Sequence, residues 1–286
     1  AGRNSAATSY QVSRPVRYGL AVSEEELGAD APVLIQGGLE NAFRRAAAWS
    51  FETVEIHIRN PRTLDAGAVA NAARDAGVGI SAVGTGLEYS LNGLNLTSPD
   101  VDLRRQTSVR FQEHIDLASK FDAAVFVGLC RGTAPDCGQR DEYLDRFAGE
   151  LVPLAEYAQR REVVLSLEPI AAYMTSLLNT TQETLAFLSR PGLETIMLLM
   201  DTHHMFIEDG DMDQTFDRCK DRIAHLHISD SDRRFGVSGE IDYAAVGASL
   251  KRIGYDRSVS LEILPDPDGE TAALKGLSWM REVWGE

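Results

Sequence analysis

The sequence predicts one closed (β/α)8 barrel, and three observations support this prediction. Short apolar runs of strand character alternate with helical patterns along all 286 residues, which gives eight strand–helix units. No linker rich in Pro, Gly or Ser divides the chain, so we assign residues 1–15 to an N-terminal tail and residues 16–286 to a single catalytic barrel domain. Finally, four consecutive strands end in residues that can bind a metal.

The first half of the chain supplies four of the units. The predicted strands cover residues 16–21, 53–58, 79–83 and 123–129, and the predicted helices cover 38–49, 66–76, 103–120 and 141–159. Long loops follow the third strand (84–101) and the fourth (130–140), and another follows the seventh (229–242). Because these loops leave the C-terminal ends of barrel strands, we expect them to contact the substrate.

Strands five to eight each end in a possible metal ligand. V-V-L-S-L-E ends at Glu168, I-M-L-L-M-D at Asp201, I-A-H-L-H at His227 and V-S-L-E at Glu262, and the helices after them are predicted at 181–188, 212–220, 244–253 and 271–283. Side chains alternate along a strand. The residues at odd steps before each ligand are all apolar, as expected for the face against the helices, so the ligands point to the barrel axis: Leu165, Leu167, Leu198, Met200, Ala224, Leu226, Val259 and Leu261.

Two glutamates, an aspartate and a histidine at one point predict a metal centre at the barrel mouth. Such ligands suit one divalent ion, Mn²⁺ first, with Mg²⁺, Co²⁺ or Zn²⁺ as alternatives. The ion would polarise a carbonyl and its neighbouring hydroxyl. Glu168 and Glu262, on strands five and eight, are the predicted catalytic pair, which would remove a proton beside the carbonyl and return it on the other face. The predicted reaction is isomerisation or epimerisation of a ketose or oxidised sugar through an enediolate.

Five further residues are candidate substrate contacts. His204 follows Asp201 by three residues, Arg233 follows His227 by six, and His57 points inward from strand two. Glu88 and Arg131 lie in the mouth loops. Each also has a structural alternative, such as a loop cap for His204 or an exposed side chain for Arg233, with Arg234 as its competitor.

Two other polar residues face the barrel axis by the same alternation. Glu55 lies two residues before His57, and His225 lies two residues before His227. For His225 we expect a satisfied histidine of the barrel interior that supports the metal ligands.

Charge and composition exclude several classes of partner. The formal net charge of −15 repels phosphodiester backbones and acidic membranes, so we expect no nucleic acid and no membrane as partner. No stretch approaches the roughly 20 apolar residues of a membrane span. Three cysteines, an odd number without a framework, favour a reducing compartment, and with no apolar signal core at the start we predict a cytoplasmic protein.

The motifs together resemble a known superfamily. L-E-P at 167–169, M-D-T-H-H-M at 200–205, H-L-H-I-S-D-S-D-R at 225–233 and L-E-I at 261–263 are similar to those of the xylose-isomerase-like TIM barrels. Within it they resemble the sugar phosphate isomerase/epimerase branch, typified by D-tagatose and D-psicose 3-epimerases. The resemblance implies the same four metal ligands and the same acid/base pair, with His204 and Arg233 at substrate-contacting positions.

One departure from the branch concerns the substrate. Ketose epimerases carry a further glutamate six residues after the strand-five ligand, where this chain has Met174. A thioether is a poor partner for sugar hydroxyls, so a substrate with an apolar or aglycone portion is favoured. The alternative function is therefore a lyase of the same fold, either a C-glycoside deglycosylase acting on a 3-oxo-glycoside or a dehydratase that eliminates water.

Two other functional classes fit the sequence less well. A tri-zinc endonuclease would need extra ligands, but Gly84 and Gly86 follow strand three, and E-I-D replaces an expected Asp-x-His beyond strand seven. A non-catalytic subunit would not need intact ligands. Barrels of this kind often pair, so we expect a homo-oligomer or a hetero-oligomer with a second subunit.

Overall fold

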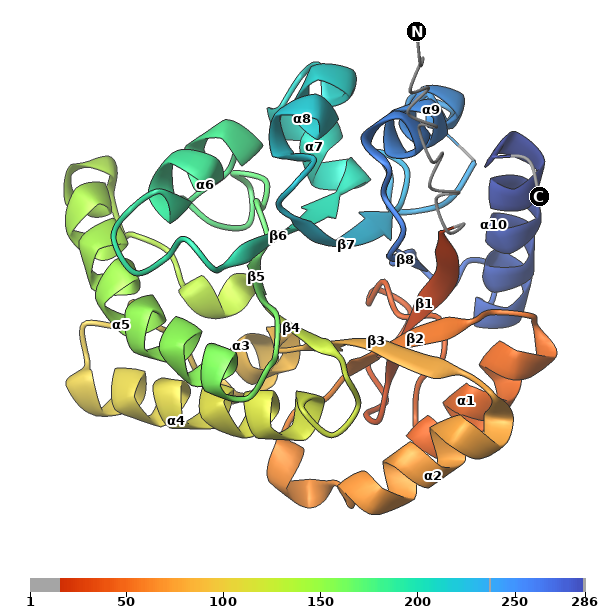
Figure 1. Cartoon of the computed structure of the whole chain (residues 1–286), viewed down its shortest axis with the longest axis horizontal. Coiled ribbons are helices and arrows are strands. Elements are labelled where there is room, and N and C mark those ends of the chain that lie inside the picture. Colours follow the sequence, from red (N-terminus) through yellow and green to blue (C-terminus); the bar gives the residue numbers. More distant parts are fainter. Residues whose placement is uncertain (1–15, 237, 285–286) are drawn as a thin grey trace, which may run out of the picture.

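The computed structural model describes residues 16–236 and 238–284, and its eight strands close into an all-parallel barrel (Figure 1). This confirms the predicted fold, while the predicted tail at 1–15 lies outside the described residues. The strands pair in chain order, and β8 closes on β1. They are β1 (Arg17–Ser23), β2 (Thr53–His57), β3 (Gly79–Gly84), β4 (Ala124–Val127), β5 (Leu165–Leu167), β6 (Met197–Asp201), β7 (Ile223–Ile228) and β8 (Ser258–Leu261).

Helices surround the barrel (Figure 1). They are α1 (Leu39–Ala48), α2 (Ala66–Ala76), α3 (Gly86–Asn92), α4 (Val101–Ala118), α5 (Arg140–Arg160), α6 (Thr181–Leu188), α7 (Thr202–Glu208), α8 (Met212–Cys219), α9 (Tyr243–Ile253) and α10 (Gly269–Trp284). Eight agree with the predicted segments within a few residues. The sequence prediction missed α3, which lies inside the expected loop at 84–101, and α7, which starts directly after β6.

Local signals explain where several helices start and stop. The carboxylates of Asp65, Asp100 and Asp211 accept hydrogen bonds from backbone N–H groups in the first turns of α2, α4 and α8. Gly77 and Gly254 end α2 and α9 in the left-handed conformation that glycine adopts without a steric penalty. The glycine ends of α2 and α9 lead into short connections at the bottom of the barrel, whereas the longer loops lie at the mouth.

Side chains alternate along the strands, so the sheet has one face that packs against the helices and another that lines the interior of the barrel. All eight apolar residues predicted to face the helices are buried, from Leu165 to Leu261. The narrow interior contains the small apolar cluster of Ala82, Phe126 and Leu199, together with buried polar side chains. A polar barrel interior is unusual against the branched apolar layers typical of this fold.

Register brings the predicted ligands to one level. Asp201 at the end of β6 pairs with His227 in β7. Glu168 and Glu262 each follow their strand directly, and their backbone N–H groups donate to Val127 and Ile228, which continues the sheet by one residue.

Two composition-based expectations can be compared with the structure. None of the helices within 16–236 and 238–284 has both the length and the apolar character needed to cross a bilayer. Cys130, Cys137 and Cys219 are all unpaired.

Candidate metal centre

The four predicted ligands converge at the mouth of the barrel. One side-chain atom each from Glu168, Asp201 and His227 lies within 4.8 Å of the other two. Oε2 of Glu262 lies 3.4 Å from Nδ1 of His227. Glu168, Asp201 and His227 are buried, and Glu262 is only slightly exposed. This group of residues could hold a metal ion.

His227 is the centre of this arrangement. Its Nε2 lies 2.7 Å from Oε2 of Glu55, and its buried Nδ1 has no hydrogen-bond partner of ordinary geometry. Carboxylate oxygens of Glu168 and Asp201 lie 3.8 and 3.9 Å from that Nδ1. A carboxylate only accepts hydrogen bonds, so Nε2 carries a proton and Nδ1 is the atom available to a metal.

Electrostatics favour a cation here. Burial by itself lowers the pKa of His227, but Glu55 and Glu262 outweigh burial and raise the pKa above its ordinary value. The extra proton belongs on Nδ1, and a divalent ion would displace it. Burial raises the pKa of Glu168 to about 8, and the neighbouring Glu262 and Asp201 add to this effect. The contributions of Glu55, Glu262 and Asp201 to these two shifts show that negative charge gathers around one point.

Arg233 supplies a positive charge at the same point. Its Nη1 donates to Oδ2 of Asp201 at 2.6 Å and to Oε2 of Glu262 at 2.9 Å. Burial alone would raise the pKa of Asp201, but Arg233 and neighbouring histidines hold it below its usual value. Two of the four candidate ligands therefore already bind a cationic group.

His204 lies beside Arg233. Its Nδ1 lies 3.3 Å from the backbone nitrogen of Ala171. Burial lowers the pKa of His204 to about 3, which keeps the ring neutral. Nη2 of Arg233 can only donate and lies 2.9 Å from Nε2 of His204, so Nε2 accepts this hydrogen bond and the proton of the neutral ring lies on Nδ1. The guanidinium of Arg233 is therefore the donor of this pair.

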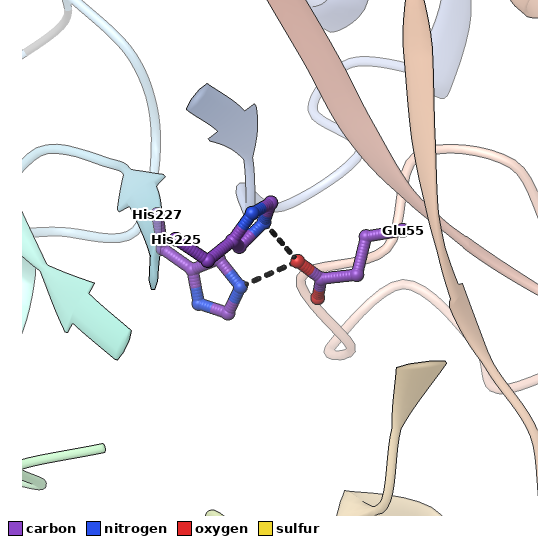
Figure 2. A group of neighbouring side chains, drawn as sticks. All are labelled: Glu55, His225 and His227. Carbon is purple, nitrogen blue, oxygen red and sulfur yellow. Dashed lines mark hydrogen bonds and ion pairs between the residues drawn. The ribbon is translucent and has the colours of Figure 1, made fainter. Parts of the chain in front are cut away.

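Glu55 lies below the four ligands and was not among the predicted site residues. Figure 2 shows its carboxylate facing His225 and His227, and His57 contacts it as well, at 2.6 Å from Oε1. Burial by itself raises the pKa of Glu55, but His227, His225 and His57 together hold it well below its usual value. The only sequence signal was the inward parity that Glu55 shares with His57.

A cavity of about 570 Å³ opens above the centre. The predicted residues His57, Glu168, His204, Arg233 and Glu262 all line it. Much of the remaining wall is apolar, and it includes Leu27, Pro32, Val33, Leu87, Phe126, Leu129, Ile170, Tyr173, Met174 and Leu264. Sequence reasoning missed most of this wall because its residues come from loops of several different units.

The structure places the predicted contacts Glu88 and Arg131 elsewhere, since neither is among the described residues that line the cavity. The carboxylate of Glu88 in α3 accepts from Arg110 at 2.8 Å and lies 3.0 Å from Nε2 of His114. Arg131 is fully buried and donates to backbone carbonyls, including those of Gly128 and Glu168. Its guanidinium therefore supports the backbone at the end of β5.

A comparison with protein families identifies the fold family. The profile described as xylose isomerase-like TIM barrel matches residues 43–283. The chain belongs to this family.

Known relatives give the family a chemical context. An L-ribulose 3-epimerase of Mesorhizobium japonicum is 27% identical over 88% of this chain and 84% of its own. A 3-dehydro-D-guloside 4-epimerase of Escherichia coli K12 is 28% identical over 45% of this chain and 49% of its own. A solved structure of L-ribulose 3-epimerase superposes with a TM-score of 0.79 at 25% identity and covers 94% of this chain and 95% of that one.

Proposed function

We propose that this chain is a divalent-metal-dependent isomerase or epimerase of a ketose or oxidised sugar. The observation that carries the proposal is the convergence of three carboxylates on the unpartnered Nδ1 of His227, beside a cavity at the mouth of the barrel. The relatives support the class of reaction, because those compared above are named as sugar epimerases.

Glu168, Asp201, His227 and Glu262 would hold one divalent ion, for which we propose Mn²⁺ first. Three carboxylates and one imidazole are a mixed oxygen and nitrogen donor set, which suits this ion and also Mg²⁺, Co²⁺ or Zn²⁺. When bound, the ion would act as a Lewis acid that stabilises negative charge on the substrate's carbonyl oxygen.

The proton transfers fall to Glu168 and Glu262. Both line the cavity, and they follow strands separated by β6 and β7, so they approach a substrate from different sides. One carboxylate removes the proton from the carbon beside the carbonyl, and the other returns a proton to the opposite face. The N–H groups of Arg233 would hold a substrate oxygen and stabilise the charge of the enediolate, and His204, which accepts from Arg233, would orient the guanidinium.

The apolar wall of the cavity indicates which kind of substrate it can bind. Tyr173 and Met174 are 66% and 39% exposed and lie over the same cavity as Ile170 and Leu87. These side chains bind poorly to a bare polyol and well to an apolar group. We therefore propose an oxidised glycoside, or a ketose with an apolar substituent, ahead of a simple free ketohexose.

A direct test is turnover in D₂O with Mn²⁺, using L-ribulose, D-psicose and 3-dehydro-glycosides as substrates. NMR should show an epimer or isomer with deuterium at the carbon beside the carbonyl, and mass analysis should show no loss of an aglycone or of water. Products that have lost either group would replace isomerisation by elimination.

The acid/base assignment is tested by Glu262→Gln. We expect turnover to fall by about 10²–10⁴-fold, because the amide cannot transfer the proton, while Mn²⁺ still binds. Glu156→Gln, which removes an exposed carboxylate from α5, is the matched control and should retain full activity. A wild-type rate in Glu262→Gln would overturn the role of this residue.

We also propose two further properties of the protein on the basis of its sequence. These are the assembly into a homo-oligomer or a hetero-oligomer with a second subunit, and the cytoplasmic location. Light scattering of the purified chain would test the first.

A further inference from the structure

Glu55 occupies an uncommon position for a carboxylate. It is fully buried in β2, inside the barrel, and three imidazole nitrogens surround it. Oε1 lies 2.6 Å from Nε2 of His57, and Oε2 lies 2.7 Å from Nε2 of both His225 and His227 (Figure 2). The bond to His227 joins β2 to β7 across the interior, because these strands are not neighbours in the barrel.

The geometry determines where the protons lie. A buried ionised carboxylate only accepts hydrogen bonds and needs donors around it. Each of the three Nε2 atoms must therefore carry a proton that it donates to Glu55. In neutral His227 this leaves the Nδ1 lone pair facing Glu168, Asp201 and Glu262, and His57 keeps an equivalent lone pair at a position that lines the cavity.

We propose that Glu55 is a positioning residue that fixes the tautomer and orientation of His227 for metal binding and, through its other oxygen, those of His57 for substrate binding. This inference rests on the proposed metal-dependent function. In this proposal Glu55 would act through the two histidines, without itself contacting the metal or the substrate.

Loss of the Glu55 carboxylate should weaken metal binding by an amount that can be estimated. Carboxylates that receive the second N–H of a metal-bound histidine typically contribute 10–100-fold to affinity. In Glu55→Gln the amide keeps one acceptor oxygen but turns an NH₂ donor towards an imidazole on the other side. At least one histidine must then rotate or change tautomer. We expect the Kd for Mn²⁺, measured by EPR of the free ion, to rise by about 10–100-fold.

Glu88→Gln is the matched control for this measurement. It is the same substitution at another buried carboxylate that contacts an imidazole Nε2, but Glu88 does not line the cavity. Its Kd for Mn²⁺ should equal that of the wild type. A Glu55→Gln protein with unchanged Kd would overturn the positioning role while leaving the proposed function intact, whereas a wild-type protein that binds no Mn²⁺ would overturn both.

A second measurement needs no variant, so it decides the matter even if Glu55→Gln does not fold. Long-range ¹H–¹⁵N correlation spectra of the wild-type protein with Zn²⁺ bound should show the Nε2–H tautomer for His57, His225 and His227. An Nδ1–H tautomer at His227 would show that Glu55 does not position the ligand nitrogen and would end the proposal.

Discussion

Two buried glutamates in this molecule make the same kind of contact and serve different ends. Glu55 and Glu88 are 0% and 1% exposed, and the carboxylate of each lies within 3.0 Å of a histidine Nε2. The carboxylate of Glu88 also accepts hydrogen bonds from Arg110 in α4 and Asn92 in α3, so its charge is balanced locally. Within the described part of the chain, the side-chain hydrogen bonds of Glu55 come from imidazoles alone, those of His57 in β2 and of His225 and His227 in β7.

The histidines sharpen the contrast. Nδ1 of His114 and Nδ1 of His227 are both buried without a hydrogen-bond partner. Three carboxylates face the nitrogen of His227, whereas no group of three potential metal ligands among residues 16–236 and 238–284 includes His114. An unpartnered imidazole nitrogen therefore indicates a ligand only where acidic side chains converge on it.

The largest expected effect separates these two histidines. His227→Gln removes a proposed direct ligand, so the Kd for Mn²⁺ should rise by more than the roughly 100-fold upper range for an outer partner, with loss of turnover. His114→Gln should lower the free energy of unfolding by about 1–3 kcal/mol, because it disturbs the buried partner of Glu88, and should leave Mn²⁺ affinity unchanged. Equal Mn²⁺ affinities in the two variants, measured by calorimetry, would remove the distinction between the clusters.

More of the candidate metal site than of these two clusters could be predicted from the sequence. The convergence of Glu168, Asp201, His227 and Glu262 was predictable because strand parity and strand ends are local properties, and parallel strands bring their ends to one edge. Two of the three partners of Glu55, His225 and His227, lie about 170 residues away in the chain, so only its inward direction was predictable. The assignment of Glu88 to the mouth assumed a loop at 84–101, but α3 directs its carboxylate to α4.

A smaller effect is expected in the pH dependence of stability. Burial alone raises the pKa of Glu88, but His114, Asn92 and Arg110 bring it below the ordinary 4.5. The ionised group therefore stabilises the fold at pH above 4.5, and this contribution is lost as the pH falls below 4.5 towards the folded-state pKa. Glu88→Gln should cost about 1–3 kcal/mol at pH 7 in urea unfolding, and the difference from wild type should shrink below pH 4.5. A difference that stayed constant with pH would contradict the charged role of Glu88.

The smallest expected effect concerns the link from Glu55 to the cavity. A Cβ added at Gly84 in β3 would lie 2.7 Å from Nδ1 of His57 and 3.0 Å from Phe126, so His57 would have to move against its bond to Glu55. Crowding of about 1 kcal/mol should raise KM roughly five-fold in Gly84→Ala while Mn²⁺ affinity stays unchanged. Gly79→Ala on the same strand is the matched control, because its Cβ would meet Thr53 at an ordinary 3.6 Å. If both variants keep the wild-type KM, His57 takes no part in substrate binding, and the influence of Glu55 ends at His227.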